Sequence, residues 1–311
     1  MNTLSVINRL AKENRKELIS KSEERYRSEI DRLVSLVAEN EKYKIILLAG
    51  PSGSGKTTTA HMVKDTFAQR GIIAQVVSLD NFYMTADKMP RLPNGDPDFE
   101  SVYSLDIPEI HRCFYEIITK DKTSIPIFDF TKGGRLDEPY EIDIHDHGII
   151  IVEGIHALNP ILTEHLPNIN LLKVYISVNC AVYDDSGKEI LSSRKMRLAR
   201  RMSRDFIYRN TSAERTLKMW TAVIEGEEKY LYRFKETADM RFSTFHNFEP
   251  CIFKDIIVKM LENLPDGTDN YDYAMSLKCG LEQFESLSTS LVPETSLIRE
   301  FISGGKYENC K

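Results

Sequence analysis

The sequence predicts an α/β fold in which helices flank a central parallel sheet. A run of three Ile and one Val at residues 149–152 is typical of a strand buried on both faces of such a sheet. Apolar runs of strand length alternate with helical stretches such as residues 57–70, which is the pattern of parallel strands joined by helices. The runs lie at residues 45–49, 74–79, 149–152 and 171–178, with a weaker run at 125–130.

Extensions are expected at both ends of this α/β region. Residues 1–42 lack Gly and Pro, and Tyr26, Ile30, Leu33, Val34 and Val37 follow helical spacing. We expect an amphipathic helix that packs on the main domain or on a partner chain, with membrane binding as the lesser alternative because acidic residues interrupt the basic ones. The expected division is an N-terminal helical extension, a central domain and a C-terminal helical extension, at 1–42, 43–265 and 266–311. Long loops are expected at 87–108 and 184–187, helical structure from 256 and a less regular end from 287.

Composition narrows the class of protein. The 311 residues carry a formal net charge of −6, so no basic excess favours nucleic acid as a partner. The five cysteines form no CxxC pair, which argues against a zinc ribbon and a disulfide framework. No apolar run resembles a signal peptide or is long enough to span a bilayer, so a cytoplasmic location is expected.

A phosphate-binding loop follows the first predicted strand. The segment from Gly50 to Thr57 fits GxxxxGK[ST] and lies between a strand and a helix, as the mechanism requires. Backbone N–H groups and the helix dipole favour phosphate there, while Lys56 adds a positive charge and Thr57 a hydroxyl for Mg²⁺. The loop therefore predicts binding of a nucleoside triphosphate with Mg²⁺. The predicted nucleotide-binding residues are Gly50, Pro51, Ser52, Gly53, Ser54, Gly55, Lys56, Thr57 and Thr58.

Two carboxylates at predicted strand ends indicate a small-molecule kinase. The chain lacks the NKxD motif of GTPases, and its fourth strand ends in Glu153-Gly154 and not in the Asp-Glu pair usual in motors. Glu153 can help Thr57 to hold Mg²⁺, or can be a structural carboxylate. Asp80 ends the second strand, where it can accept the proton of an acceptor hydroxyl, or can simply cap a turn.

A basic segment supplies the third predicted element. Arg197, Arg200, Arg201 and Arg204 have the spacing of one helix face. Such a stripe can close over ATP as an arginine-bearing lid and neutralise charge on the transferred phosphoryl group. It can also bind nucleic acid or form a solvated face.

The ordered motifs GPSGSGKTT, SLDNFY, DPDFESVYSLD, IPIFDF, IIIVEGI and RLARRMSRD resemble the uridine kinase family, within the group that also holds phosphoribulokinase. The resemblance covers about residues 44–260, and segment 298–305 resembles the tail of bacterial members. It implies a P-loop kinase that transfers the γ-phosphate of ATP, with Mg²⁺, to the 5′-hydroxyl of a pyrimidine nucleoside. The family often forms oligomers, which leaves the oligomeric state of this chain open, with a homo-oligomer as one possibility. From composition and charge, neither nucleic acid nor a membrane is an expected partner.

The same resemblance assigns roles to individual residues. Asp80 matches the catalytic aspartate, and the arginines at 197, 200, 201 and 204 match the lid. The nucleoside side is matched by Tyr83, Phe99, Glu100, Phe128, Phe130 and Arg135. Aromatic faces that stack on a base support this assignment, although Phe128 and Phe130 could equally be core residues on one face of a strand.

The sequence departs from the family pattern where the base is read. The family usually has a His after IPIFDF, but this chain has Thr131-Lys-Gly133-Gly134-Arg135. Another nucleoside, a sugar phosphate or a pantothenate-like metabolite is therefore an alternative acceptor. A nucleotide-dependent RNA-binding regulator is the non-enzymatic alternative. His145 and His147 flank Asp146, a pattern more typical of a loop than of a metal site.

Overall fold

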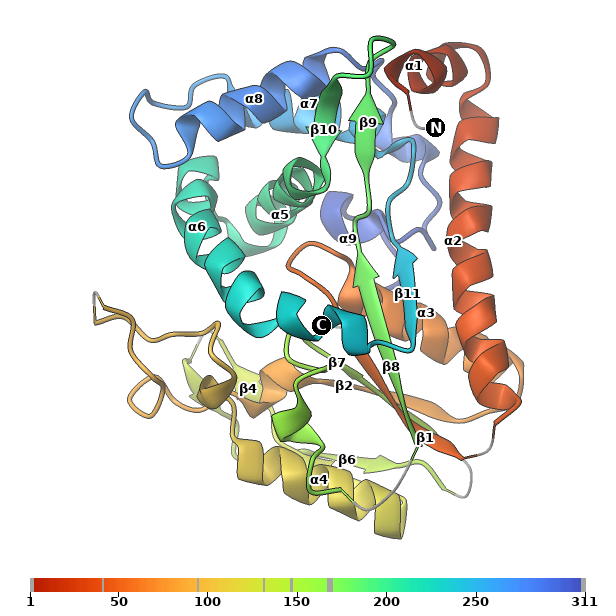
Figure 1. Ribbon diagram of the computed structural model, residues 1–311, viewed down its shortest axis with the longest axis vertical. Coiled ribbons are helices and arrows are strands. Elements are labelled where there is room, and N and C mark those ends of the chain that lie inside the picture. The colour runs from red at the N-terminus through yellow and green to blue at the C-terminus, as the bar shows by residue number, and fades with distance from the viewer. Residues whose placement is uncertain are drawn as a thin grey trace.

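The computed structural model describes residues 3–40, 42–93, 95–130, 132–145, 148–166 and 170–308. At its centre lies a five-stranded sheet in which neighbouring strands are parallel (Figure 1). Across the sheet the strands are β11 (Met240–Ser243), β8 (Asn170–Ser177), β1 (Tyr43–Ala49), β7 (Ile149–Glu153) and β2 (Ala74–Ser78). The predicted α/β fold with a parallel sheet and flanking helices is confirmed.

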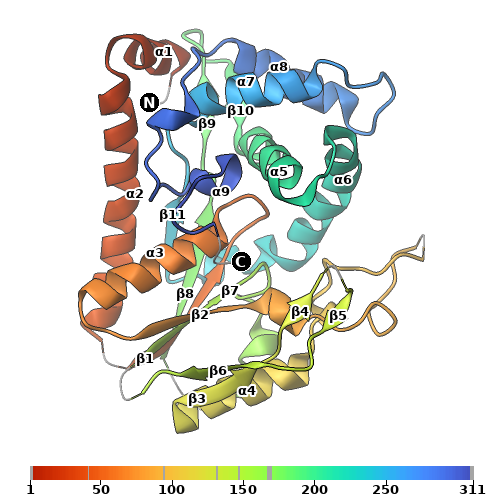
Figure 2. The same ribbon diagram turned by 180° about the vertical axis from the view of Figure 1, so that it is seen from behind.

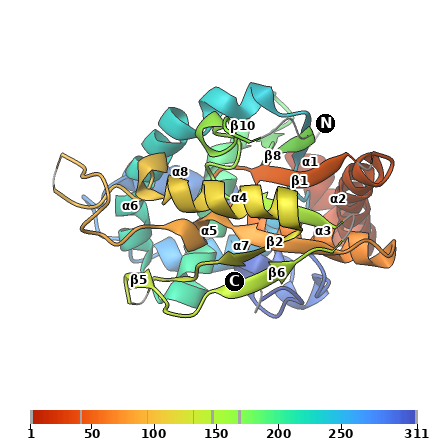
Figure 3. The ribbon, with the colours of Figure 1, turned by 90° about the horizontal axis from the view of Figure 1, so that it is seen from below.

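The sheet separates two hydrophobic cores because successive side chains of a strand point to opposite faces. In β1, Ile46 and Leu48 join the core that includes helix α3 (Lys56–Gln69), while Ile45 and Leu47 join the core that includes α4 (Ile107–Lys120). Figure 3 shows α4 lying across one side of the sheet. Every residue of β7 is buried, as its β-branched run predicts. Burial on both faces thus holds β7, and with it Glu153 at its end, in the middle of the molecule.

The weak apolar run at 125–130 was expected to be a strand of the fold, and this expectation is wrong for the main sheet. The chain forms β3 (Lys122–Ile125) and then β4 (Phe128–Asp129), each in a separate antiparallel pair. Pro126 lies between them and has no N–H to continue a ladder. Their partners are β6 (Tyr140–Asp143) and β5 (Gly134–Arg135). The edge strand β11, in contrast, was not predicted.

The N-terminal region forms two helices where one was expected. They are α1 (Leu4–Glu13) and α2 (Arg15–Ala38), and the chain breaks at Asn14, whose φ and ψ are −147° and 57°. The five apolar residues predicted to share a face are at most 2% exposed. They join the same core as α3, and Figure 2 shows α2 standing beside that helix. This helix therefore packs on the α/β region itself.

The second half of the chain is mainly helical. A hairpin of β9 (Ala181–Tyr183) and β10 (Glu189–Ser192) precedes it, and Gly187 turns the hairpin with a φ of +86°. In the first half, the loop predicted at 87–108 ends at Asp106, whose side chain caps the N-terminus of α4. Helices α5 (Ser193–Arg209), α6 (Ala213–Tyr230), α7 (Glu249–Leu261), α8 (Tyr271–Glu282) and α9 (Arg299–Ile302) follow. None of the described helices is long and apolar enough to cross a membrane.

Candidate active site

The predicted phosphate loop joins β1 to the first turn of α3, as the motif requires. Gly53 and Gly55 have φ values of +75° and +83°, which residues with a Cβ adopt rarely. A Cβ on Gly50 would lie 2.5 Å from the Ile176 carbonyl oxygen, so the loop also requires a close backbone approach there. Lys56 extends back along the loop and donates to the Pro51 carbonyl at 3.4 Å. The positive charge of Lys56 is therefore held at the loop by contacts within the loop itself.

Acidic groups from other elements surround Lys56. The Thr57 hydroxyl donates to Glu153 at 3.3 Å, which joins the first turn of α3 to the end of β7. Burial, together with the charge of Asp80, raises the pKa of Glu153 to about 7, and Lys56 opposes that shift. The predicted Mg²⁺ residues Thr57 and Glu153 thus lie together. Their hydroxyl and carboxylate oxygens are ligands that suit Mg²⁺.

Asp80 is the second residue of the 3₁₀ turn η1 (Leu79–Phe82), which follows the carboxyl end of β2. Its backbone N–H donates to the Ser78 hydroxyl, so Ser78 caps this turn and the Asp80 carboxylate is not used as the cap. The side chain is open to solvent, yet loss of hydration beside the protein raises its pKa, and Lys56 and Arg209 lower it. A carboxylate with raised proton affinity, close to the loop lysine, is suited to accept a proton.

The aromatic residues predicted for the acceptor form one cluster around Tyr83. Its ring centroid lies 5.7 Å from that of Phe99, 5.8 Å from that of Phe128 and 5.8 Å from that of Phe130. Tyr83 is buried and donates its hydroxyl to the Phe99 carbonyl at 2.8 Å. Phe99 and Phe130 are 41% and 58% exposed, so they are not core residues. Phe128 is buried beneath them.

The remaining predicted acceptor residues lie on either side of this cluster. Glu100 packs against α6, where a Cβ on Gly226 would lie 2.5 Å from the Glu100 Cβ. Burial raises the pKa of Glu100 to about 7, while Arg201 lowers it. Arg135 pairs with Asp106 at 3.1 Å and donates to the Phe82 carbonyl at 3.2 Å. These contacts hold Arg135 near η1 without filling its whole donor set.

The predicted arginine stripe is divided between two environments. Arg197 pairs with Glu227 of α6 at 2.7 Å, and Arg200 pairs with Glu249 of α7 at 2.6 Å. All four side chains are 2% exposed or less. An arginine buried in this way is needed to balance its carboxylate. The expectation that these two arginines face an open lid surface is therefore corrected.

Arg201 and Arg204 are less deeply buried, with side chains 12% and 13% exposed. Arg201 donates to the Ser52 hydroxyl at 2.7 Å. Buried Asp205 orients this side of the helix, at 3.3 Å from Arg201, 2.8 Å from Arg204 and 3.3 Å from Arg209. Arg209 was not predicted, although it is one more turn along the same helix and its charge affects Asp80. The extended spacing of arginines was a signal that could have found it.

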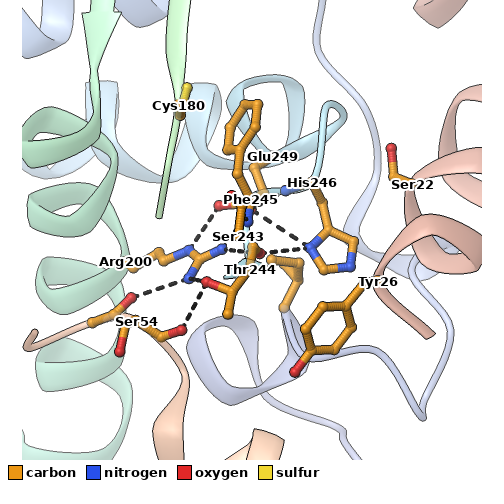
Figure 4. A network of polar contacts seen from close by, with 12 residues as sticks. Ser22, Tyr26, Ser54, Cys180, Arg200, Ser243, Thr244, Phe245, His246 and Glu249 are labelled. Carbon is orange, nitrogen blue, oxygen red and sulfur yellow. Dashed lines mark hydrogen bonds and ion pairs between the residues drawn. The ribbon is translucent and has the colours of Figure 1, made fainter. Parts of the chain in front are cut away.

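A buried polar network supports the loop from behind (Figure 4). The Arg200 guanidinium donates to the Gly53 carbonyl at 3.1 Å, and the Thr244 hydroxyl donates to the Ser54 carbonyl at 2.8 Å. Glu249 accepts from the backbone N–H of His246 at 2.6 Å. The network binds carbonyl oxygens of the loop and leaves its N–H groups unused. Two loop N–H groups have other partners in the described residues: that of Ser52 donates to Glu227 at 2.8 Å, and that of Ser54 donates to the Pro51 carbonyl at 3.1 Å.

The C-terminal segment also reaches the loop, and the sequence did not suggest this. A Cβ on Gly55 would lie 2.7 Å from Leu297. The Thr58 hydroxyl donates to Glu300 of α9 at 2.6 Å. Thus segments nearly 250 residues apart in the chain meet at the first turn of α3.

Of the predicted histidine pair, His147 lies outside the described residues, and His145 contacts Asp143 at 3.2 Å.

Comparison with known proteins identifies the family. Residues 45–248 match the phosphoribulokinase/uridine kinase family. The chain belongs to this family. Membership implies a P-loop kinase that transfers phosphate from ATP to a small-molecule acceptor, and it leaves the acceptor unspecified.

Individual relatives are distant. The chain is 28% identical to a uridine kinase of Schizosaccharomyces pombe over 59% of its length, but the match spans only 36% of that relative. It is 26% identical to a uridine kinase of Lactobacillus helveticus over 61% of this chain and 81% of the relative. A solved structure of a candidate fructose transport system kinase from Silicibacter sp. TM1040 is similar with a TM-score of 0.51 and 16% identity, over 68% of this chain and 98% of that one. That likeness shows the fold alone.

Proposed function

We propose that the chain transfers the γ-phosphate of ATP to the 5′-hydroxyl of a pyrimidine nucleoside, with uridine the first expected acceptor and cytidine the second. The observation that carries the proposal is the cluster of Phe99, Phe128 and Phe130 around Tyr83, which lies three residues after Asp80 and within range of its charge. Exposed aromatic rings offer stacking area to a base, which a sugar phosphate does not need.

The donor half of the reaction is assigned to the loop. Loop N–H groups and Lys56 hold the phosphates, and Arg201 and Arg204 balance charge on the transferred group. Thr57 and Glu153 would hold Mg²⁺, since a cation would offset the burial and the nearby charge of Asp80 that together raise the pKa of Glu153. The bound ion would supply further positive charge to the phosphate oxygens. Arg197 and Arg200 act by positioning, through their buried carboxylate partners.

The acceptor half is assigned to Asp80. Its carboxylate takes the proton of the 5′-hydroxyl while the hydroxyl oxygen forms a bond to the γ-phosphorus and the bond to the ADP oxygen breaks. The raised pKa of Asp80 strengthens it as a base, and the charge of Lys56 favours its ionised form. Glu100 accepts hydrogen bonds from ribose hydroxyls.

A panel of acceptors with labelled ATP tests the proposal. We expect turnover of uridine above cytidine, purine nucleosides, a pentose phosphate and pantothenate. Turnover of a non-nucleoside without turnover of uridine or cytidine would contradict it and favour another acceptor for the same fold. The missing base-reading His near Gly133 is the specific reason to include those competitors.

A further inference from the structure

His156 lies in the turn that follows β7, three residues after Glu153. Its side chain is only 2% exposed, and neither ring nitrogen makes a hydrogen bond with the described residues. The Glu100 backbone lies close enough to favour a proton on the ring, but it does not complete a hydrogen bond. Since a ring has two nitrogens, at least one is available to a group that the protein does not supply. Buried polar groups without a partner are rare because each one costs about 1–3 kcal/mol.

One turn of α6 places this ring in the candidate site. Gly226 contacts Glu100, the next residue, Glu227, accepts from the loop N–H of Ser52, and Tyr230 contacts His156 with ring centroids 5.7 Å apart. The donor loop, the acceptor carboxylate and the buried imidazole therefore converge on a single helical turn. The charge of Lys56 also acts on the His156 ring, so the loop lysine lies within electrostatic range of it.

We propose that His156 is a specificity-determining residue of the acceptor site, and that its imidazole hydrogen-bonds to a hydroxyl group on the sugar portion of an uncharged acceptor. This inference rests on the proposed acceptor function. It adds a residue that the sequence motifs did not supply, and it restricts the acceptor to uncharged molecules.

The electrostatic surroundings favour a hydroxyl over an anion as the partner of His156. Burial and the charge of Lys56 lower the pKa of His156 to about 4, so the ring is uncharged near neutral pH. An uncharged imidazole has one donor and one acceptor nitrogen, which matches a hydroxyl group. A phosphate or carboxylate would meet no positive charge on the ring itself and would approach the carboxyl group of Glu100. A nucleoside or another uncharged polyol fits better than a sugar phosphate.

The test compares the wild type with His156→Phe, His156→Gln and the control His165→Phe. His165 is an exposed histidine stacked on His111, with ring centroids 3.3 Å apart, so its replacement makes the same chemical change outside the site. We expect His156→Phe to raise the KM for uridine about tenfold while the KM for ATP changes less than twofold. His156→Gln should recover part of the loss, and His165→Phe should match the wild type.

Thermal unfolding separates recognition from a structural role. Because the His156 nitrogens are unpartnered, His156→Phe should unfold at or above the wild-type temperature, and a large decrease would overturn the inference. An unchanged KM for the acceptor, whichever acceptor the wild type uses, would also overturn it. Preference for a pentose phosphate would refute both the uncharged acceptor and the proposed function. Turnover of another uncharged polyol, with a His156-dependent KM, would refute only the pyrimidine nucleoside.

If none of the tested acceptors is phosphorylated, a binding measurement tests the role of His156 instead. Uridine is titrated by calorimetry into protein saturated with a non-hydrolysable ATP analogue. Weaker binding to His156→Phe than to the wild type and to His165→Phe supports the inference. Equal affinity, or no uridine binding to any of the proteins, overturns it.

Discussion

Arg200→Met should remove most of the support behind the phosphate loop. The guanidinium makes five hydrogen bonds, to both Glu249 oxygens, to the hydroxyl and carbonyl of Thr244, and to the Gly53 carbonyl. Arg200 and Glu249 are both 0% exposed, so the variant leaves a buried carboxylate without its cation. Removal of one partner of such a pair costs about 3–5 kcal/mol. For a chain of this size, that loss lowers the unfolding midpoint by roughly 6–10 °C.

The matched control is Arg194→Met on the same helix. Arg194 pairs with Glu228, and their side chains are 50% and 56% exposed. Exposed pairs contribute about 0–1 kcal/mol, so this variant should unfold close to the wild type. Urea unfolding of both variants at pH 7, analysed with a common m-value, gives the comparison. Adding Glu249→Gln to Arg200→Met should recover part of the loss because it removes the unpaired charge.

The pH dependence gives a second check on the same reasoning. Burial opposes the charge on Glu249, but Arg200 and the hydrogen bond from His246 hold its pKa below the usual value. Without Arg200 the pKa should rise, so Glu249 can bind a proton and the stability deficit should shrink as the pH falls toward 4. If Arg200→Met loses turnover but no more stability than Arg194→Met, Arg200 acts on phosphate directly and the buried-pair argument is wrong.

Three further predictions concern the candidate site. Asp80→Asn should lower kcat about 10²- to 10⁴-fold with little change in the KM for ATP, measured with labelled ATP; near wild-type turnover would remove Asp80 from the mechanism. Gly226→Ala should raise the KM for the acceptor more than that for ATP, since its Cβ would displace Glu100; equal changes in both would contradict this. Glu100→Gln should leave stability unchanged below pH 4.5 and raise it, by at most about 3 kcal/mol, above pH 7. The sign follows because the folded-state pKa of Glu100 is raised to about 7, so the folded wild type loses stability as the pH rises through that interval. Urea unfolding at pH 4.5 and pH 8 measures it, and a stabilisation confined to low pH would refute the assignment.

Local spacing was enough to predict the parts of the fold that local chemistry determines. The loop from Gly50 to Thr57 needs positive φ angles and a strand–helix junction. Its glycines and the apolar run before it, all close together in the chain, indicate both. The β-branched run at 149–152 is buried because nothing polar interrupts it. Edge strand β11 escaped prediction because its four residues, Met-Arg-Phe-Ser, alternate apolar with polar side chains and form no apolar run. The run at 125–130 misled because its composition resembles a strand while Pro126 divides it.

Contacts between residues distant in the chain determined the environment of each charged side chain, which the sequence could not indicate. Arg197, Arg200, Arg201 and Arg204 are alike in a linear motif, and the tertiary structure separates them by placing Glu227 and Glu249 against the first two. His156 looked like any other scattered histidine until folding buried it beside α6. The sequence by itself determined the fold class and the phosphate loop, since spacing encodes backbone geometry. The tertiary structure alone decided which charged and polar groups remain free for a ligand, because that depends on which others they meet.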